Sequence, residues 1–373
     1  MNKGQSLFAL AQLVAMIFVL SFAASAQQAT EAVRRKALSE EARKFIAQNA
    51  EALGISKQPD AGKAGEPFSA AAPAIPFVYR YVSALAISPD FATDRTVFAA
   101  VYNGGVFKST DAGLTWTAMN NGLDNFRVQA LEVSPNFTVD QTLFVGTSDP
   151  PGAVGRTYRS TDGGGSWIKL TTGFAPSRVE DFAFSPDYAS DQTIFAAAPG
   201  ITKSTDGGNT WNSISPGGGR AVSIGLSPQY SFDQTIYMGT IWDLQKSTDD
   251  GNTWETLLSI GIGLPGDEFG DIAVSPNYAV DSTLFVTYPF GLLRSQDAGS
   301  AWVIVLPFAT GQIVLSPAYT SDSTIFAGCA SGVYKSTDGG NSWLLSDQGF
   351  TNLSIEALAL TPDYPNESVL LAG

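Results

Sequence analysis

Aspartate is the residue type whose spacing in this chain most invites a chemical role. The frame Ser-x-Asp-x-Gly-x-(Thr/Ser)-Trp occurs six times between Ser109 and Trp343, with Ala301 at the Thr/Ser position of one copy. A carboxylate there can bind a cation, exchange a proton or accept hydrogen bonds from the amides of its own turn. Six equivalent copies cannot form one active site, so we assign them a structural role. The aspartates of this frame, which we call the box, are Asp111, Asp162, Asp206, Asp249, Asp297 and Asp338.

A second series of aspartates lies two residues before a threonine in each repeated unit. The positions that would supply the other ligands of a calcium ion vary, since four units hold Asp90, Asn136, Gln229 and Ala318 there. We therefore expect these aspartates to cap turns, and we expect neither a metal nor another cofactor. They are Asp94, Asp140, Asp191, Asp233, Asp281 and Asp322.

The composition removes several kinds of chemistry. The chain has no histidine, and Cys329 is its only cysteine, so histidine-based triads, imidazole proton shuttles and an internal disulfide are excluded. An enzyme built on this chain would depend on carboxylates, tyrosine or lysine. The net charge of −14 argues against nucleic acid or an anionic membrane surface as a partner. Twelve of the 35 acidic residues belong to the two repeated aspartate positions.

Repeated short strands must position these side chains. A Ser/Thr-Pro signature between apolar runs recurs with its prolines 41 to 51 residues apart, a period typical of supersecondary units that bury their faces against one another. The third unit predicts strands at Asp181–Ser185, Thr193–Ala197, Ile201–Ser204 and Thr210–Ile214, because these runs are β-branched or aromatic and are bounded by turn residues. The sequence therefore predicts an all-β fold, a β-propeller of four-stranded blades.

The expected propeller has seven blades, of which the last is incomplete. The seventh unit predicts only two strands, Ile355–Thr361 and Ser368–Ala372, and it has no box before Gly373. We expect a truncated C-terminus, which the DNA beyond the Gly373 codon would reveal. The alternative is a natural chain whose open blade is completed by a partner strand.

The N-terminal residues predict export. Residues 1–26 combine Lys3, an apolar run from Leu7 to Leu20 and a small-residue cleavage site at Ala26, which is typical of a signal peptide; an uncleaved anchor helix is the alternative. Residues 27–76 predict a short helix and a linker rich in Ala, Pro and Gly, and residues 77–373 predict the propeller. We expect an extracytoplasmic protein.

One pattern in the loops goes beyond the repeat. Arg127, Arg178 and Arg220 each lie seven residues before the Ser of a Ser-Pro signature, at the entry to the innermost strand of consecutive blades. Three converging guanidinium groups would bind a carboxylate, a phosphate or an acidic peptide. The alternative is local pairing with Asp124, Glu180 or another nearby carboxylate. The predicted rim of this site consists of Trp242, Asp243, Phe269, Tyr288 and Phe290.

The boxes and the spacer Ser-Pro-Asp-Tyr…Asp-x-Thr-Ile-Phe-Ala-Gly together resemble the Asp-box (BNR-repeat) β-propeller superfamily over roughly residues 80–373. That superfamily includes sialidases, xyloglucan-degrading endoglucanases, sortilin-type receptor domains and photosystem II stability/assembly factors. The Arg-Ile-Pro motif of sialidases is missing, and one propeller supplies only half of a xyloglucanase cleft. The resemblance therefore implies a non-enzymatic module that binds a protein, peptide or glycan, with a glycoside hydrolase as the alternative.

Overall fold

We describe the fold from a computed structural model. The described residues are 55–57, 81–148, 155–171, 178–215, 219–259, 268–307, 310–346, 354–366 and 369–373. The predicted signal peptide and most of the predicted helix and linker lie outside these residues. Of residues 27–76, only β1 (Ile55–Lys57) is described, and it pairs in parallel with the outer strand of the sixth blade.

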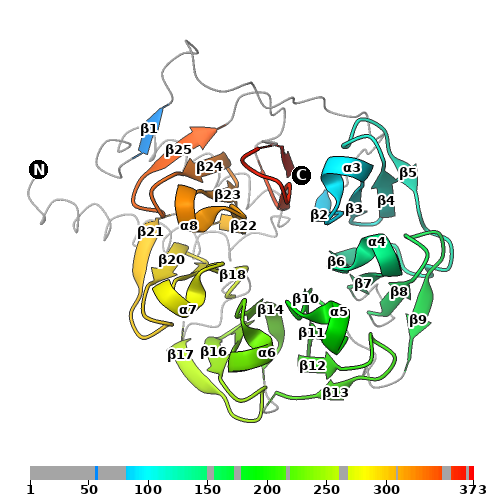
Figure 1. The fold of residues 1–373 in the computed structure, drawn as a ribbon, viewed down its shortest axis with the longest axis horizontal. Coiled ribbons are helices and arrows are strands. Elements are labelled where there is room, and N and C mark those ends of the chain that lie inside the picture. Colours follow the sequence, from blue (N-terminus) through cyan, green and yellow to red (C-terminus); the bar gives the residue numbers. More distant parts are fainter. Residues whose placement is uncertain are drawn as a thin grey trace, which may run out of the picture.

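Six antiparallel sheets of consecutive strands stand around a ring, with the first strand of each sheet innermost (Figure 1). Blades one to three consist of β2 (Val82–Ile87), β3 (Val97–Val101), β4 (Gly105–Ser109) and β5 (Thr117–Ala118); β6 (Val128–Val133), β7 (Leu143–Thr147), β8 (Thr157–Ser160) and β9 (Ile168–Leu170); and β10 (Asp181–Phe184), β11 (Ile194–Ala198), β12 (Gly200–Ser204) and β13 (Asn212–Ser213). Blades four to six consist of β14 (Ala221–Leu226), β15 (Ile236–Thr240), β16 (Asp243–Ser247) and β17 (Glu255–Ser259); β18 (Ile272–Val274), β19 (Leu284–Tyr288), β20 (Gly291–Ser295) and β21 (Val303–Leu306); and β22 (Thr310–Leu315), β23 (Ile325–Cys329), β24 (Gly332–Ser336) and β25 (Trp343–Ser346).

The β-propeller of four-stranded blades is confirmed, but the number of blades differs from the expected seven. Six blades have four strands of their own, and the seventh unit forms only a two-stranded sheet, β26 (Leu358–Leu360) with β27 (Leu370–Ala372). This sheet lies between blade six and blade one (Figure 1).

A four-residue helix joins the first strand to the second in every blade. Each helix begins with a buried aromatic residue and ends before a residue in the left-handed region, with φ between 48° and 54°. The helices are α3 (Phe91–Asp94), α4 (Phe137–Asp140), α5 (Tyr188–Asp191), α6 (Tyr230–Asp233), α7 (Tyr278–Asp281) and α8 (Tyr319–Asp322). In the described part of the chain, no helix is long and apolar enough to cross a membrane.

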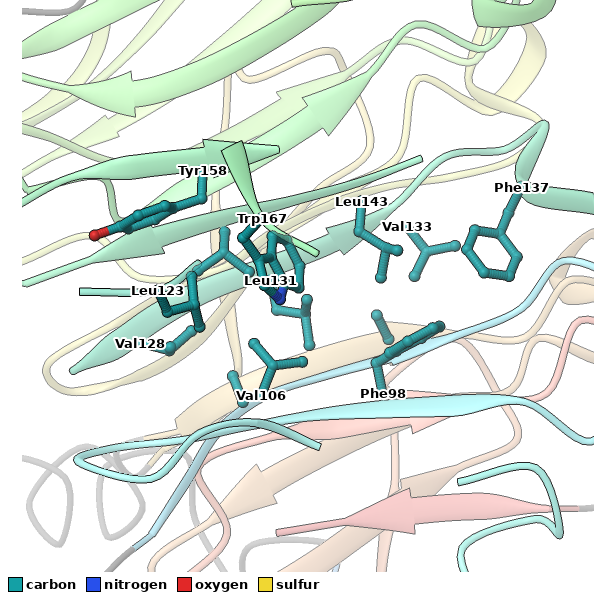
Figure 2. Packing of buried hydrophobic residues seen from close by; sticks show 13 residues of the cluster. Phe98, Val106, Leu123, Val128, Leu131, Val133, Phe137, Leu143, Tyr158 and Trp167 are labelled. Atoms are coloured by element: carbon teal, nitrogen blue, oxygen red, sulfur yellow. The ribbon is translucent and has the colours of Figure 1, made fainter. Parts of the chain in front are cut away.

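The core consists of the interfaces between blades. Figure 2 shows Phe98 and Val106 of blade one facing Leu131 and Trp167 of blade two. All four side chains are almost completely buried, and the Trp167 indole donates a hydrogen bond of 2.7 Å to the carbonyl of Met119 in the preceding blade. Burial of this apolar surface holds neighbouring blades together, since each sheet covers one face of the next.

Every third strand carries a basic residue at the same position. In five blades it binds the box turn of the next blade: Lys108 donates to Gly163 O (3.3 Å), Arg159 to Gly207 O (2.8 Å), Lys203 to Asp250 Oδ2 (2.6 Å), Lys246 to Ala298 O (3.3 Å) and Arg294 to Gly339 O (2.6 Å). Lys335 of blade six holds the same position, and its ammonium group lies over the rings of Phe326 and Tyr364.

Candidate functional site

The box aspartates accept hydrogen bonds from neighbouring residues of their own turns. In blade three, Asp206 accepts hydrogen bonds from the Ser204 hydroxyl (2.8 Å), the Thr210 amide (2.8 Å) and the Thr210 hydroxyl (2.7 Å). All six boxes repeat the bonds from the serine hydroxyl and from the amide four residues after the aspartate. The hydrogen bond from the Thr115 hydroxyl contributes most to lowering the pKa of Asp111 to about 2. These carboxylates hold hairpins together.

The second series of aspartates caps turns. Asp191 accepts hydrogen bonds from the Ser185 hydroxyl (2.6 Å) and the Thr193 amide (2.8 Å), so it joins the end of the first strand to the start of the second. The other five blades repeat both bonds. Within the described ranges, no group of three or more Asp, Glu, Cys or His residues could hold a metal ion.

Most basic residues outside the repeated third-strand position lie on one face of the ring. Residues 81–373 contain twelve lysines and arginines, of which six hold the repeated third-strand position. We call one face of the ring the loop face: it carries the loops that join the second strand of a blade to its third and the loops that join one blade to the next. Five of the other six basic residues lie in or beside these loops. These five are Arg127, Arg156, Lys169, Arg178 and Arg220. The sixth, Arg95, follows α3 on the opposite face, which carries the helices and boxes.

Two of the three predicted arginines share one carboxylate. Glu180, whose side chain is only 6% exposed, binds Arg178 Nε and, at 3.0 Å, Arg220 Nη2 of the next blade. Arg220 also binds Glu268 of blade five at 3.3 Å. Burial raises the pKa of Glu180, and the two guanidinium groups oppose that shift. Two positive and two negative groups therefore form a chain across three blades.

Arg127 has a different environment. Its guanidinium lies over the ring of Tyr102, 5.8 Å from the ring centroid, and Tyr81 stacks on Tyr102 with the two centroids 5.0 Å apart. Tyr81 is 44% exposed, and the neighbouring Phe126 is 46% exposed. This part of the loop face combines a positive charge with accessible aromatic rings.

The predicted rim divides into surface and core. Trp242 of blade four is 43% exposed. In blade five, Tyr288 packs edge-to-face on Phe290. Asp243 accepts a hydrogen bond from the Ser259 hydroxyl. Phe269, in contrast, is 2% exposed and packs in the core between blades four and five, so its predicted place on the rim is wrong. The repeat could have predicted that Phe269 is buried, because the matching positions in other units hold the buried apolar residues Val128, Val179, Ala221 and Ile355.

Three carboxylates near the ring axis were not predicted as a group. Asp181 accepts the Ile224 amide of the next blade at 2.9 Å, and Asp271 accepts the Ile313 amide of the next blade at 2.8 Å. Burial, reinforced by the charges of Asp181 and Asp271, raises the pKa of Glu132 to about 8. Burial is also the main cause that raises the pKa of Asp181 to about 7 and that of Asp271 to about 6. The sequence could have indicated this group, because acidic residues occur in or next to innermost strands that are otherwise mostly apolar.

Fold and surface together define a β-propeller with a polar and aromatic loop face. No family model matches the sequence, and no curated protein matches it either. Among solved structures, the GH74 xyloglucanase from Xanthomonas campestris superposes with a TM-score of 0.60 at 18% identity, over 79% of this chain and 51% of the xyloglucanase. This chain thus spans about half of that enzyme.

Two further solved structures resemble the chain. The extracellular domain of the hybrid two-component system BT4673 from B. thetaiotaomicron has a TM-score of 0.58 at 15% identity, over 78% of this chain and 36% of that one. YCF48 from Cyanidioschyzon merolae has a TM-score of 0.51 at 14% identity, over 75% of this chain and 89% of that one. At these identities the comparisons support the fold alone.

Proposed function

We propose that this chain is an exported, non-enzymatic Asp-box propeller that binds a protein, peptide or glycan ligand on the loop face of blades one to five. The observation that carries the proposal is the distribution of charge. The repeated aspartates are committed to turns, and six basic residues hold the third-strand position. Five of the remaining six basic residues lie on the loop face, where Arg127 lies over the ring of Tyr102 and Trp242 is exposed.

The chemistry of this face favours an anionic ligand with flat or apolar parts. Four cations pair with Asp124, Glu180 and Glu268, and the fifth, Arg127, lies over the ring of Tyr102, in a protein whose net charge is −14. Arg127 and the stacked tyrosines offer an aromatic platform with a charge beside it, which suits a uronic-acid glycan or an acidic peptide.

Binding arrays test the proposal. Purified protein is offered uronic-acid and sulfated oligosaccharides and acidic peptides, and the variants Arg127→Ser, Arg156→Ser and Trp242→Ala are compared with Arg95→Ser on the opposite face. We expect the first three to weaken binding at least tenfold and Arg95→Ser to leave it unchanged. Equal loss in all four variants, or no ligand at all, would contradict a loop-face site.

A glycoside hydrolase is the alternative that the same purified protein can exclude. Two carboxylates that such an enzyme could use are engaged in structure, since Glu180 binds two arginines and Asp271 accepts the Ile313 amide. We therefore expect no turnover of sialosides or β-glucans. Sustained turnover that Glu180→Gln or Asp271→Asn abolishes would establish an enzyme.

A further inference from the structure

One outer strand presents exposed apolar side chains on the rim of the ring. β21 is the fourth strand of blade five and lies outermost in that blade (Figure 1). Val303 is 59% exposed and Ile304 is 40% exposed, and Ala301, just before the strand, is exposed as well. The sequence has no charged residue from Ser300 to Ala309. We call residues Ala301–Ile304 the apolar edge.

The outer strands of most other blades have features that discourage pairing. β5 and β13 are only two residues long, and β9 and β17 carry the charged residues Lys169 and Glu255. Short edge strands and edge charges are common means by which proteins prevent strands of other molecules from adding to a sheet. β25 of blade six is uncharged, and β1 pairs with it. Among the described outer strands, β21 is thus the one that is longer than two residues and has neither a charge nor a paired fifth strand.

Blade six shows what such an edge can bind. β1 runs parallel to β25 and pairs with Trp343–Leu345, which begin at the tryptophan of the box. The matching residues of blade five are Trp302–Ile304. The register between β20 and β21 shifts only beyond Ile304, where Val305 is an extra residue. The three positions that bind β1 in blade six are therefore also regular in blade five.

The Ile304 amide points away from its own blade. In blade one, the Met119 amide donates a hydrogen bond of 2.8 Å to Val106 O of the third strand. Successive amides of a strand point to opposite sides, so the amide of Ala118, one residue earlier, points outward. Ile304 holds the position of Ala118 in the repeat. Its N–H group is therefore directed toward an added strand.

The box of blade five adds a charge at the start of the apolar edge. In the five other boxes, Oδ2 of the aspartate accepts a hydrogen bond of 2.6–2.7 Å from a Thr or Ser hydroxyl. Ala301 holds that position in blade five and has no hydroxyl group. Oδ1 of Asp297 accepts the usual bonds from the Ser295 hydroxyl and the Ala301 amide, both of 2.8 Å. The exposed Asp297 can therefore accept a hydrogen bond from a basic side chain through Oδ2.

We propose that the apolar edge binds an extended strand of a partner polypeptide, which adds in parallel to β21 and carries a basic residue that pairs with Asp297. Backbone hydrogen bonds to the edge, including one from the Ile304 amide, provide affinity, and apolar side chains of the partner cover Val303 and Ile304. The edge lies on the outer rim and not on the loop face, so this proposal does not depend on the proposed function.

A single strand fits this edge better than a folded second copy of the chain does. A stable interface between folded proteins buries about 800 Å² on each partner, which four edge residues cannot supply. Two copies with a net charge of −14 each would also repel one another, whereas a basic strand is attracted.

A short peptide copied from the segment around β1 is the probe. Residues 53–57, preceded by an added arginine and blocked at both ends, would be titrated into the full chain, and a second peptide would have glutamate in place of the added arginine. NMR spectra would report binding at each backbone amide, and hydrogen exchange would follow the Ile304 amide. We expect saturable 1:1 binding of the arginine peptide, with shifts at Trp302–Ile304 and slower exchange of Ile304. The glutamate peptide should bind at least threefold more weakly.

Variants decide whether the apolar edge is the binding site. Val303→Lys places a charge on the edge, and Ile304→Pro removes its outward amide, so each should weaken binding of the arginine peptide at least tenfold. The matched controls Ile168→Lys and Ala118→Pro make the same changes at the matching positions of blades two and one and should leave binding unchanged. Ala301→Thr supplies the missing hydroxyl group of the box and should reduce the difference between the two peptides.

Four results would overturn the proposal. Absence of saturable binding would show that the edge does not accept a strand. Shifts confined to Trp343–Leu345 would show that the peptide replaces β1 on blade six. Slow exchange of Ile304 before the peptide is added would show that the edge is already paired. A concentration-dependent dimer in sedimentation that Val303→Lys abolishes would assign the edge to a second copy of the chain.

Discussion

Lys203 Nζ lies 2.6 Å from Asp250 Oδ2, which ties the third strand of blade three to the box turn of blade four. Tyr230 donates a hydrogen bond to the same carboxylate, and the Lys203 side chain is only 14% exposed. The pair is thus a partly buried junction between blades.

Loss of this junction should destabilise the protein. Lys203→Met leaves Asp250 without its cation, and we expect the free energy of unfolding to fall by about 1–3 kcal/mol. Lys335→Met is the matched control, because Lys335 also lies over two rings but no described box turn faces it; its effect should stay below about 1 kcal/mol. Urea unfolding measures both. Equal effects of the two substitutions would contradict a tie between blades.

The carboxylates near the ring axis should make stability depend on pH. Their pKa values are raised in the folded state, to about 8 for Glu132, about 7 for Asp181 and about 6 for Asp271, so the folded protein holds these protons more tightly than the unfolded chain does. The free energy of unfolding should therefore fall as the pH rises from about 5 to about 8.

Glu132→Gln tests the origin of that dependence. The neutral amide cannot ionise, so the variant should be more stable than the original protein at pH 8 by roughly 1–5 kcal/mol and should show a flatter pH profile. Urea unfolding at several pH values provides the measurement. Glu255→Gln on the exposed strand β17 is the control, and an equally flattened profile there would refute the assignment to Glu132.

The predicted arginines should separate into a structural and a surface class. Arg220→Ala removes a partner of the buried Glu180 and should cost about 1–3 kcal/mol of stability, whereas Arg127→Ala should cost less than about 1 kcal/mol. In a double-mutant cycle, Glu180→Gln should reduce the cost of Arg220→Ala. Strict additivity in that cycle would mean that the salt bridge contributes nothing.

Aromatic residues of the predicted rim should behave in two ways. Phe269→Ala creates a cavity between blades four and five and should cost about 3–5 kcal/mol. Trp242→Ala removes a side chain that is 43% exposed and should cost less than about 1 kcal/mol. Thermal unfolding compares the two. Similar losses of stability would show that Trp242 also belongs to the core.

Local repetition made the fold predictable from sequence. In the third unit the predicted strand Ile201–Ser204 became β12 (Gly200–Ser204), because strand propensity, turn residues and period agreed. The same comparison between units would have placed Phe269 in the core, since its counterparts Val128 and Val179 are apolar and buried. Comparison of positions between blades is therefore more informative than residue type alone.

Contacts across blades limited the prediction of the site. Arg220 and Glu268 hold the same position in neighbouring blades, so their pairing could be anticipated from the repeat. The sharing of Glu180 between Arg178 and Arg220 depends on side-chain directions that the sequence does not specify. The raised pKa of Glu132 depends likewise on residues about 50 and 140 positions away that only the closed ring brings near it.

The residue after each short helix gives the chain an unused reserve of stability. All six adopt a left-handed conformation, with φ from 48° to 54°, and none of them is glycine or asparagine: Arg95, Gln141, Gln192, Gln234, Ser282 and Ser323. Such a conformation costs a residue with a Cβ on the order of 1 kcal/mol, and asparagine tolerates it better than serine or arginine does. Because each residue lies in a different blade, the gains from substitution would add. An engineer could raise the melting temperature of this protein one blade at a time, without touching its core or its loop face.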